Sequence, residues 1–540
     1  MRFVPVRAAV LGALFAAIIT LPGLGSGTLW DNSETVYGEV AREILLTHDW
    51  VVMHLNGAPW FIQPPLFFWI AALCAKAFGL TAFALRLPAA LATMAMSAAV
   101  GYAAARVAGA RAGTVAAVVL ATSLMQAIVG RLVIMDALLD LCVVIAILCW
   151  FRALQGHGGA SAFVCGALAL AFGTLAKGPV APVIVVLVIA VWLVWERRSS
   201  APIVCPSFAT LAVAAGAFVV IVAPWFVLEA LRAGPQSLAV LIGQYTVGRF
   251  TGVIENQSGP WWYYVPVLVL GFFPWIAFVP VAAVNAIDVA RTRAGSLERL
   301  ALTWAGVPFI FFSAAQTKLP NYIALLLPAL AIVVALWFER IADAAERRAA
   351  IWSALTIPLF IAALGIAIAL FIRTNHIADA TTIVVPPAEI LGALMLLGSL
   401  ATVAAIASPD WNWLAPYVLG VTSGALVLFI AFVAEPAAEA LKPIPPIARV
   451  IGEQRTPGSV VAIRGVAGTN ALIFYTAPVV LTVDEDDPRG AVCAARDLFL
   501  VTRTADVPEL EALAAARHRN SLELGNLQRD SLLHIDGPGC

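Results

Sequence analysis

The sequence predicts an all-α polytopic membrane protein with about 13 transmembrane helices, followed by a small C-terminal α/β domain. The chain has 540 residues, of which 62% are hydrophobic and only 12% are charged. Apolar stretches of roughly 20 residues, each enough to cross a bilayer, recur along most of the chain. After residue 440 the composition changes, and short apolar segments alternate with polar turns. A wholly soluble globular protein is therefore excluded.

Thirteen apolar segments are predicted to span the membrane. The first follows Arg2 and Arg7, and we expect it to be a retained anchor because no small-x-small cleavage site follows it. The shorter segment 65–80 is predicted to be a helix that lies beside the membrane. The predicted spans are centred near residues 5–24, 86–105, 112–129, 133–151, 161–176, 179–195, 207–228, 262–283, 300–315, 320–338, 351–372, 388–407 and 413–434.

The distribution of positive charge predicts the orientation of the chain. Arginines gather in the short connections on one side, which marks that side as cytoplasmic. The N-terminus is then cytoplasmic, and an odd number of spans places the C-terminus outside. We therefore expect a membrane domain over residues 1–440, with long external loops at 25–85 and 229–261, and an external domain over residues 441–540. The net charge of +0 gives no indication of a nucleic-acid partner.

The C-terminal region is predicted to be an α/β domain of about 100 residues, a size that can fold alone. Cys493 and Cys540 are its only cysteines, whereas the other five of the seven lie in or beside apolar segments. Because thiols outside the cytoplasm tend to be oxidised, these two cysteines are predicted to form a disulfide bond. The expected strands are 460–464, 471–476, 479–483 and 497–502, and the expected helix is 508–517.

The first external loop carries the densest polar chemistry of the chain. Ser33 to Thr47 has the periodicity of an amphipathic helix that can lie along a bilayer surface, with Glu39, Arg42 and Glu43 towards its polar face. Asp31 and Glu34 stand at its start. Either could be a base that takes a proton from an acceptor hydroxyl. Alternatively, Asp31 as N-cap and Glu34 three residues later would form a capping box.

Two aspartates lie within the fourth predicted span. Asp136 and Asp140 are four residues apart and so share one helix face. A carboxylate within the membrane costs roughly 2.5–3.5 kcal/mol on insertion scales, so it calls for a buried partner or a polar cavity. Asp136 is a candidate site residue, and the alternative is a structural ion pair with Arg131 or another basic residue. Asp140 is predicted to be structural.

Three cations are predicted to lie near the external interface. Lys177 ends the fifth span, Arg249 lies in the second external loop, and Lys318 follows the ninth span. Cations stabilise the charge that develops on a phosphate leaving group. Each could instead be a side chain that extends from a helix end towards water.

Several ordered motifs resemble the polyprenyl-phosphate-sugar glycosyltransferases, which are GT-C type membrane enzymes and include the aminoarabinose transferases of lipid A and the protein mannosyltransferases. The resemblance covers roughly residues 20–340. It is carried by SETVYGEVAREILLTHDW, FIQPP, Asp136, LAKG, APW at 223–225, GRF followed by GPWWYYVPVL and FFPW, and FFSAAQTKLPNYIALLLP.

The resemblance implies an inverting glycosyltransferase of the bacterial inner membrane, with an active site on the periplasmic face. Its donor would be a polyprenyl monophosphate sugar, and its acceptor lipid A, another glycolipid or a protein. Asp31 or Glu34 would be the catalytic residue, with Tyr37 and Gln63 as further site candidates beside Asp136. Residues that match the family's phosphate-binding positions are Arg249, Lys318, Lys177 and Tyr322.

The chain also departs from the family pattern. Ser33-Glu34 stands where the family has Asp-Glu, and Ile62-Gln63-Pro64 where it has Glu-Lys-Pro. Tyr245 and Thr246 replace its Glu-His pair. The resemblance allows a divalent metal, but these departures mean that the usual ligand positions for it are not matched. No other cofactor is indicated. The alternative function is a transporter or flippase of a lipid-linked sugar, which would call for internal repeats and more intramembrane charges than Asp136 and Asp140.

Overall fold

The computed structural model describes residues 3–197, 203–374, 378–439, 442–476, 479–527, 529–538 and 540. The chain divides into two compact units. The membrane unit consists of Met1–Gly25, Phe61–Ile70 and Arg86–Ala434. The loop–sheet unit consists of Ser26–Trp60, Ala71–Leu85 and Glu435–Cys540, so that it combines part of the first predicted external loop with the C-terminal residues.

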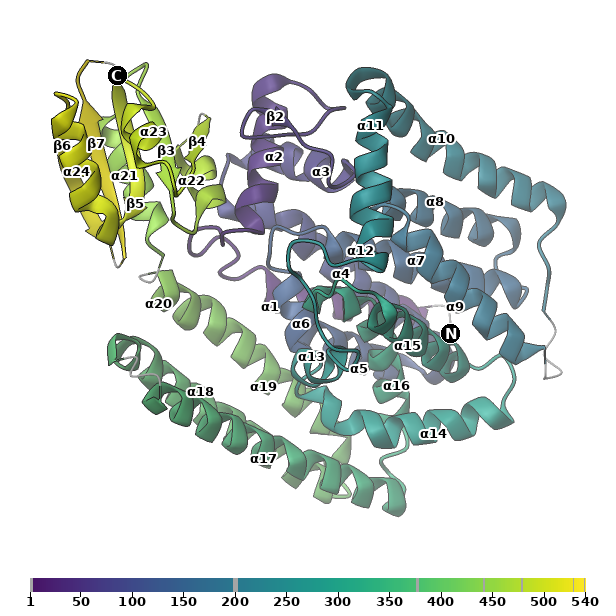
Figure 1. Ribbon diagram of the computed structural model, residues 1–540. Coiled ribbons are helices and arrows are strands. Elements are labelled where there is room, and N and C mark those ends of the chain that lie inside the picture. The colour runs from purple at the N-terminus through teal and green to yellow at the C-terminus, as the bar shows by residue number, and fades with distance from the viewer. Residues whose placement is uncertain are drawn as a thin grey trace. The chain divides into compact units, whose positions relative to one another are not determined.

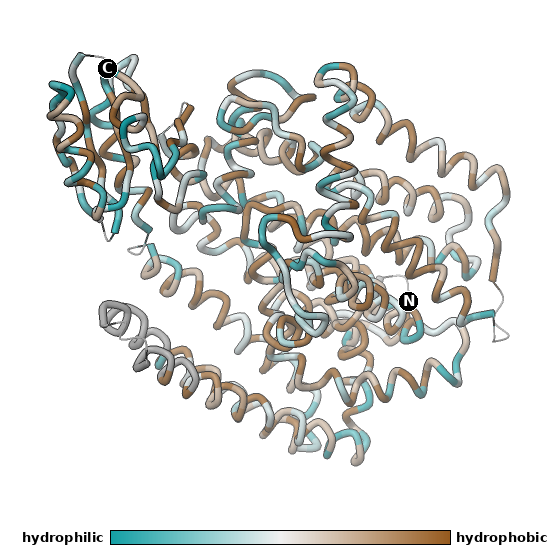
Figure 2. The backbone as a smooth tube through the Cα atoms, in the orientation of Figure 1, coloured by the Kyte–Doolittle hydropathy of each residue, from teal (hydrophilic) through white to brown (hydrophobic). Residues whose placement is uncertain are grey.

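The membrane unit is helical, and every predicted span overlaps a helix, which confirms the predicted fold class. Nine helices within the described residues are long and apolar enough to cross a bilayer. Hydrophobic residues run along these helices in Figure 2. Together with shorter ones, the helices that overlap the predicted spans are α1 (Phe3–Thr20), α4 (Ala82–Ala108), α5 (Ala110–Thr122), α6 (Leu124–Val129), α7 (Asp136–Leu154), α8 (Gly159–Lys177), α9 (Val180–Glu196), α10 (Phe208–Ala233), α13 (Tyr264–Gly271), α14 (Val279–Thr292), α15 (Leu297–Ala314), α16 (Leu327–Phe338), α17 (Ala344–Thr374), α18 (Ala378–Ala407) and α19 (Ala415–Phe429) (Figure 1).

Helix α16 lies at the centre of the membrane unit. All its residues from Leu327 to Phe338 are buried, and a helix that is apolar all round belongs in the interior of a bundle. Two buried tryptophans donate their indole N–H groups to neighbouring segments. Trp304 donates to the carbonyl of Leu325 at 2.9 Å, and Trp275 donates to the hydroxyl of Thr122 at 3.0 Å. These two bonds cross-link helices around α16, whereas the buried indole N–H of Trp192 has no hydrogen-bond partner among the described residues.

The second predicted external loop, residues 229–261, contains more helix than expected. Helix α10 ends at Gly234, whose φ of +83° suits glycine, and Pro235 then begins a new helix. The chain continues through α11 (Pro235–Leu238), the π-helix η1 (Ala239–Val247) and α12 (Gly248–Thr251). Arg249 therefore lies on a short helix rather than in a loop.

The loop–sheet unit contains a five-stranded mixed sheet with strand order β4-β3-β5-β7-β6 (Figure 1). Strand β3 is parallel to β4 and β5, whereas β7 is antiparallel to β5 and β6. Helices cover both faces, which explains the continuous apolar runs of its central strands. The elements are α21 (Ile444–Gln454), β3 (Val460–Arg464), α22 (Thr469–Thr476), β4 (Val480–Val483), α23 (Pro488–Cys493), β5 (Asp497–Arg503), α24 (Val507–Ala516), β6 (Asn520–Leu527) and β7 (Asp530–Asp536).

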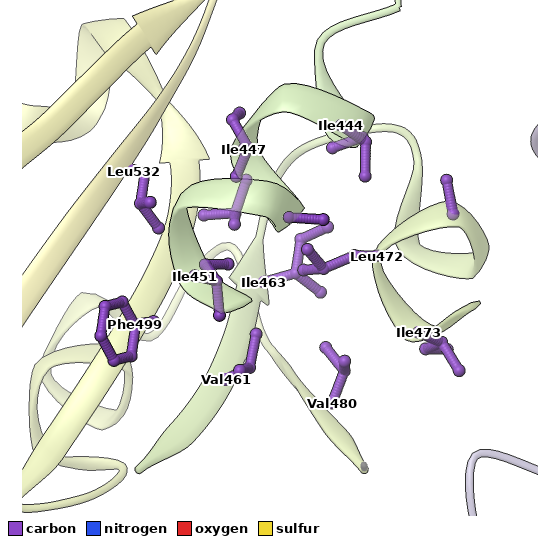
Figure 3. Packing of buried hydrophobic residues seen from close by; sticks show 13 residues of the cluster. Ile444, Ile447, Ile451, Val461, Ile463, Leu472, Ile473, Val480, Phe499 and Leu532 are labelled. Atoms are coloured by element: carbon purple, nitrogen blue, oxygen red, sulfur yellow. The ribbon is translucent and has the colours of Figure 1, made fainter. Parts of the chain in front are cut away.

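Alternate residues of the central strands supply two cores. Val461 and Ile463 of β3 pack with Ile447 and Ile451 of α21 on one face (Figure 3). Ala462, between them in sequence, packs with α23 and α24 on the other face. This is the two-residue periodicity of a strand that is buried on both sides.

One predicted strand is wrong. Residues 471–476 belong to helix α22, although their β-branched and aromatic side chains favour a strand. The segment connects β3 to β4, and because these strands are parallel, their connection must cross over the sheet. The strands expected at 460–464, 479–483 and 497–502 and the helix at 508–517 are confirmed as β3, β4, β5 and α24. The sequence analysis missed β6 and β7.

The N-terminal part of the loop–sheet unit is hydrogen-bonded to the C-terminal part. Helix α2 (Glu34–Thr47) confirms the predicted helix. It is followed by a hairpin of β1 (His54–Leu55) and β2 (Ala58–Pro59), whose turn is Asn56-Gly57 with both φ angles positive. The amide of Asn56 both donates to the carbonyl of Val480, at 2.9 Å, and accepts from its N–H, at 2.8 Å. Asn56 thereby covers part of the edge strand β4.

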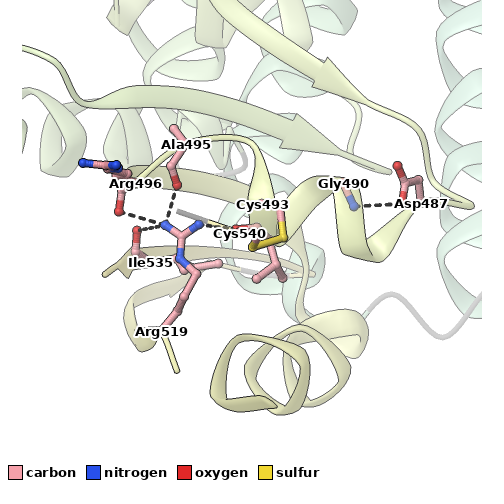
Figure 4. The surroundings of a disulfide bond; sticks show 9 residues. Asp487, Gly490, Cys493, Ala495, Arg496, Arg519, Ile535 and Cys540 are labelled. Atoms are coloured by element: carbon pink, nitrogen blue, oxygen red, sulfur yellow. Dashed lines mark hydrogen bonds between the residues drawn. A yellow bond between two sulfur atoms is a disulfide. The ribbon is translucent and has the colours of Figure 1, made fainter. Parts of the chain in front are cut away.

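The predicted disulfide bond is confirmed. Cys493 and Cys540 are joined, with their Cα atoms 5.5 Å apart. Beside the bond, the guanidinium of Arg519 donates to the carbonyls of Ala495, Arg496 and Ile535 (Figure 4). It also donates to the carbonyl of Val492. The disulfide ties the C-terminus to α23.

Cys493→Ser should destabilise the C-terminal sheet, because the disulfide closes a loop of 47 residues. Loop-closure entropy predicts a loss of about 4 kcal/mol. The measurement is protease cleavage within residues 441–540 of the full-length protein as a function of denaturant concentration. The control is Cys205→Ser, because Cys205 is an exposed free cysteine outside this unit. Equal midpoints for the two variants would contradict a stabilising role.

Candidate functional site

A cavity in the membrane unit gathers most of the predicted site residues. Its walls come from residues 62–64, the start of α7, the end of α8, the start of α9, the segment η1–α12, the end of α15 and residues 321–325. The apolar walls include Leu139, Val183, Leu241, Phe250, Phe311 and Phe312. Polar side chains that line it are Gln63, Asp136, Lys177, Tyr245, Thr246, Arg249, Asn321 and Tyr322.

Lys177 and Asp136 form a salt bridge in this cavity. The ammonium Nζ of Lys177 lies 2.6 Å from Oδ1 of Asp136, and the two side chains are only 14% and 5% exposed. Asn321 donates to the same carboxylate oxygen at 2.8 Å. Asp136 begins α7 and Lys177 ends α8, so each charge also lies at the helix end that stabilises it.

The basic partner of Asp136 is thus Lys177 and not Arg131. The guanidinium of Arg131 instead donates to the carbonyls of Thr20 and Pro22, at 2.8 and 2.9 Å. Asp140 is buried one turn further along α7, and its Oδ2 has no hydrogen-bond partner within the part of the chain that the structure describes.

Arg249 and Lys177 both contact Tyr322. The Arg249 guanidinium donates to the hydroxyl of Tyr322 at 3.0 Å and to the carboxylate of Glu255 at 3.1 Å. Its carbon Cζ lies 5.5 Å from the ring centre of Tyr245, and Nζ of Lys177 lies 5.2 Å from the ring centre of Tyr322. Both are within cation–π range, so two tyrosines help to position the two cations.

The segment that carries Arg249 is fixed by backbone hydrogen bonds. The N–H groups of Gln316, Thr317 and Lys318 donate to the carbonyls of Phe250, Arg249 and Gln257, respectively, at 2.9 to 3.0 Å. The hydroxyl of Thr317 also accepts from Ile254 and donates to Gly252. Arg249 is therefore held in place by the connection between α15 and η3 (Pro320–Leu326).

Two cations and one carboxylate line the cavity within the described residues, namely Lys177, Arg249 and Asp136. Each cation has a carboxylate partner, since Asp136 pairs with Lys177, and Glu255, outside the lining, pairs with Arg249. Burial raises the pKa of the Tyr245 phenol, as does the carboxylate of Glu255, while Arg249 lowers it. Tyr245 can therefore offer a neutral hydroxyl. The cavity suits the head of an anionic, otherwise apolar ligand.

Lys318 lies outside the lining of this cavity. Its ammonium donates to the backbone carbonyls of Ser313 and Ala315 at 2.8 and 2.7 Å, and to Phe312 at 3.3 Å. Burial lowers the pKa of this ammonium. Its donors are directed towards the C-terminal end of α15, where they satisfy terminal carbonyls.

Asp31, Glu34 and Tyr37 belong to the loop–sheet unit. Oδ1 of Asp31 accepts from the N–H of Ala471 at 2.8 Å and from the hydroxyl of Thr35 at 3.3 Å. Glu34 is fully buried, and its carboxylate accepts from the N–H of Trp30 at 3.0 Å. The N-cap of α2 is Ser33, so the proposed capping box with Asp31 as N-cap is wrong. The ring of Tyr37 meets Trp60 edge to face, with their centres 6.3 Å apart.

The polar face of α2 is buried rather than directed to water or lipid headgroups. Glu39 pairs with Arg42 at 2.5 Å, and Arg42 lies near the carbonyls of Ile473 and Phe474, both at 3.4 Å. Glu43 accepts from the N–H of Gly57 at 2.9 Å. Burial raises the pKa of Glu39 to about 7, against the opposing effect of Arg42.

Among the described residues, no group of three or more His, Cys, Asp or Glu side chains is placed so that it could hold a metal ion. Asn321 and Glu255 were missed by the sequence analysis, which named Tyr245 only as a departure from the family pattern. The sequence signal of Asn321 and Glu255 is proximity to Lys318 and Arg249, since their contacts depend on how distant segments meet.

Residues 62–228 match the family described as dolichyl-phosphate-mannose-protein mannosyltransferase. The undecaprenyl phosphate-alpha-4-amino-4-deoxy-L-arabinose arabinosyl transferase of Edwardsiella ictaluri is 32% identical over 62% of this chain and 59% of that protein. The undecaprenyl phosphate-alpha-4-amino-4-deoxy-L-arabinose arabinosyl transferase 2 of Proteus mirabilis is 30% identical over 61% of this chain and 58% of its own length. The matches span about three fifths of each relative.

The crystal structure of ArnT from Cupriavidus metallidurans bound to undecaprenyl phosphate superposes with a TM-score of 0.79. It covers 98% of this chain and 99% of that one, at 21% identity. The chain has the fold of ArnT. The apo structure of that ArnT gives a TM-score of 0.78. The resemblance inferred from the sequence motifs is thus confirmed, and the chain is a multi-pass membrane protein with an ArnT-like helical bundle.

Lys177→Met should destabilise the protein by about 3–5 kcal/mol, because it leaves the buried carboxylate of Asp136 without its cation. The double variant Asp136→Asn/Lys177→Met should be less destabilised than the sum of its two single variants. Thermal unfolding in detergent measures this coupling. Asp140→Asn is the control, since Oδ2 of Asp140 accepts no hydrogen bond among the described residues. Additive effects of the two single substitutions would contradict the ion pair.

Glu39→Gln should gain stability relative to the wild type as the pH rises from about 5 to 8. The pKa of Glu39 rises from 4.5 to about 7 in the folded protein, so the folded state binds the proton more tightly than the unfolded chain. Raising the pH through this window therefore costs stability in the wild type but not in the variant. Melting temperatures across the window give the test, with the exposed Glu453→Gln as control. A constant difference between Glu39→Gln and wild type would refute the shift.

Proposed function

We propose that the protein is an inverting glycosyltransferase that moves a sugar from a polyprenyl monophosphate to an envelope acceptor. The observation that supports this most directly is the placement of Lys177 and Arg249 around Tyr322 in a largely apolar cavity. A polyprenyl phosphate has a long apolar chain and one compact anionic group, and this cavity is complementary to both. The donor named for the arabinosyl transferases and the ligand of the superposed ArnT are polyprenyl phosphates.

In this proposal Arg249 and Lys177 bind the donor phosphate. The Arg249 guanidinium can give two parallel hydrogen bonds to phosphate oxygens, and Lys177 adds a point charge. Tyr322 and Tyr245 supply hydroxyl donors. When the bond between sugar and phosphate breaks, negative charge grows on the phosphate, and these donors stabilise it more than they stabilise the ground state.

Asp136 is proposed to be a positioning residue. Its carboxylate binds both Lys177 and Asn321, so it fixes the ammonium group at the cavity wall and lowers the net charge there. Lys318 is proposed to hold the end of α15, through its three carbonyl contacts, rather than to touch the phosphate. Gln63 lines the cavity and can donate an amide N–H to the sugar or phosphate.

Asp31 is the better candidate of the two for the group that orients or deprotonates the acceptor. Its side chain is half-buried and can be reached by an acceptor, whereas the side chain of Glu34 is fully buried. An acceptor that is itself a phosphate would need no base. Asp31→Asn would then keep activity towards a phosphorylated glycolipid and lose it towards a hydroxyl acceptor.

The cellular arrangement belongs to the same proposal. The arginine-rich connections favour a cytoplasmic N-terminus in the bacterial inner membrane, with residues 441–540 as an external domain. The start of α7 and the end of α8 then face the periplasm. A sugar carried on a lipid would be delivered to this face for transfer to lipid A, another glycolipid or a protein.

Arg249→Ala should lose far more transfer activity than Arg232→Ala. Loss of one charge-assisted donor to a developing phosphate is expected to cost about 2–4 kcal/mol in transition-state stabilisation. Arg232 is exposed at the end of α10 and is not among the cavity residues. The assay is sugar transfer from a polyprenyl-phosphate donor in detergent, with matched protein amounts. Arg249→Lys should recover only part of the activity, because lysine lacks the planar fork.

Equal activities for the two alanine variants would remove Arg249 from the phosphate site. If the protein instead moved the intact lipid-linked sugar across the liposome membrane without transfer to an acceptor, the alternative function of a flippase would be favoured.

A further inference from the structure

A second polar cavity lies in the membrane unit, at the opposite end of α7 from the candidate donor site. It has a volume of about 430 Å³, which is within the range of ligand-binding pockets. Asp136 is the first residue of α7 and Arg152 lies in its last turn, so roughly 24 Å of helix separates the two sites. This distance is close to the thickness of the hydrocarbon core, and the second cavity therefore lies at the other membrane interface.

The lining of this second cavity is divided between polar and apolar side chains. Two arginines converge there from the C-terminal turns of α4 and α7, namely Arg106 and Arg152. Tyr102, Gln155 and His157 supply further polar groups. The remaining walls are Ala99, Ala103, Val107, Ile145, Leu148, Cys149, Phe151 and Leu297.

The two arginines are not neutralised by the protein around them. Among the residues that the structure describes, no carboxylate forms an ion pair with Arg106 or Arg152. Arg152 contacts the ring of Tyr102, with Cζ 6.0 Å from the ring centre. Its Nε is enclosed and has no hydrogen-bond partner within the described residues. Five other arginines have an enclosed Nε of this kind, so the feature that distinguishes this site is the pair of arginines on one cavity, without a carboxylate partner among the described residues.

Helix ends explain part of this arrangement. Cations are stabilised at helix C-termini, and arginines favour the cytoplasmic interface. These effects account for the presence of two arginines at this face. They do not account for the convergence of both arginines on one cavity. Basic pockets between transmembrane helices on this side of a membrane bind the head groups of anionic lipids.

We propose that this cavity binds the phosphate of an anionic phospholipid, with Arg106 and Arg152 on the phosphate and the apolar walls on the adjacent acyl chains. Gln155 is held nearby by its bond to the carbonyl of Gly295 at 2.6 Å, and Tyr102 can donate its hydroxyl to the head group. The apolar part of the lining favours a lipid over free phosphate. The bound lipid would join α4 and α7 at the interface opposite to the candidate donor site.

Native mass spectrometry of the full-length protein in detergent tests this proposal. Phosphatidylglycerol is titrated against wild type, Arg152→Ala and Arg106→Ala, and phosphatidylcholine with the same acyl chains measures binding that is independent of head-group charge. Each arginine near a membrane surface contributes about 1 kcal/mol to anionic lipid binding, so each variant should bind phosphatidylglycerol about fivefold more weakly. Binding of phosphatidylcholine should not change.

Arg197→Ala is the matched control. Arg197 is exposed and follows α9, which begins beside the candidate donor site, so it lies at the same interface as Arg152 but does not line the cavity. Its loss should change phosphatidylglycerol affinity by less than about twofold. Arg152→Gln, which keeps a hydrogen-bonding side chain, serves as a second variant if Arg152→Ala does not fold. The elution profile and the melting temperature of each variant, both measured in phosphatidylcholine, show whether that variant is folded.

Equal loss of affinity in Arg197→Ala and Arg152→Ala would overturn the site, since overall charge would then explain binding. Unchanged affinity in Arg152→Ala and Arg106→Ala would overturn it as well. A third arm adds inorganic phosphate as competitor. Complete displacement of phosphatidylglycerol by millimolar phosphate would assign the cavity to a free phosphate and contradict the lipid.

Discussion

The salt bridge between Lys177 and Asp136 joins the end of α8 to the start of α7, and the geometry of the candidate donor site depends on it. Both charges are largely buried in an apolar bundle, where either one alone would be costly. Because Asp136 balances its charge, the ammonium group of Lys177 can lie at the wall of a largely apolar cavity before any ligand binds. Asn321, from η3, brings a third segment of the chain to the same carboxylate.

Tyr322 extends this constraint to Arg249. Its ring lies near Lys177 and its hydroxyl accepts from Arg249, so the two cations are placed by one side chain. The π-helix η1 and the bonds from residues 316–318 hold the segment that presents Arg249. A preorganised pair of cations needs little rearrangement when a phosphate leaves, which is the property that a transferase acting on lipid phosphates requires.

Local patterns allowed the helices to be predicted, whereas the contacts between distant segments could not be. Apolar runs located the spans because each helix must satisfy its own backbone in the bilayer. The partner of Asp136 could not be predicted, since Lys177 is on a different helix. Residues 471–476 have strand propensity but form α22, because the parallel pairing of β3 with β4 requires a crossover. Glu39 and Glu43 were placed on an open face because periodicity does not show that the C-terminal residues would cover it.

The central claim is that the cavity around Lys177, Arg249 and Tyr322 recognises the phosphate of a polyprenyl lipid. Equilibrium binding of polyprenyl phosphate and of the uncharged polyprenol of equal chain length, measured on the same protein in the same detergent, tests it most directly. The account predicts that the phosphate binds at least tenfold more tightly, on the order of 1.4 kcal/mol or more, and that this difference decreases with rising salt. Equal affinities for the two lipids would contradict it.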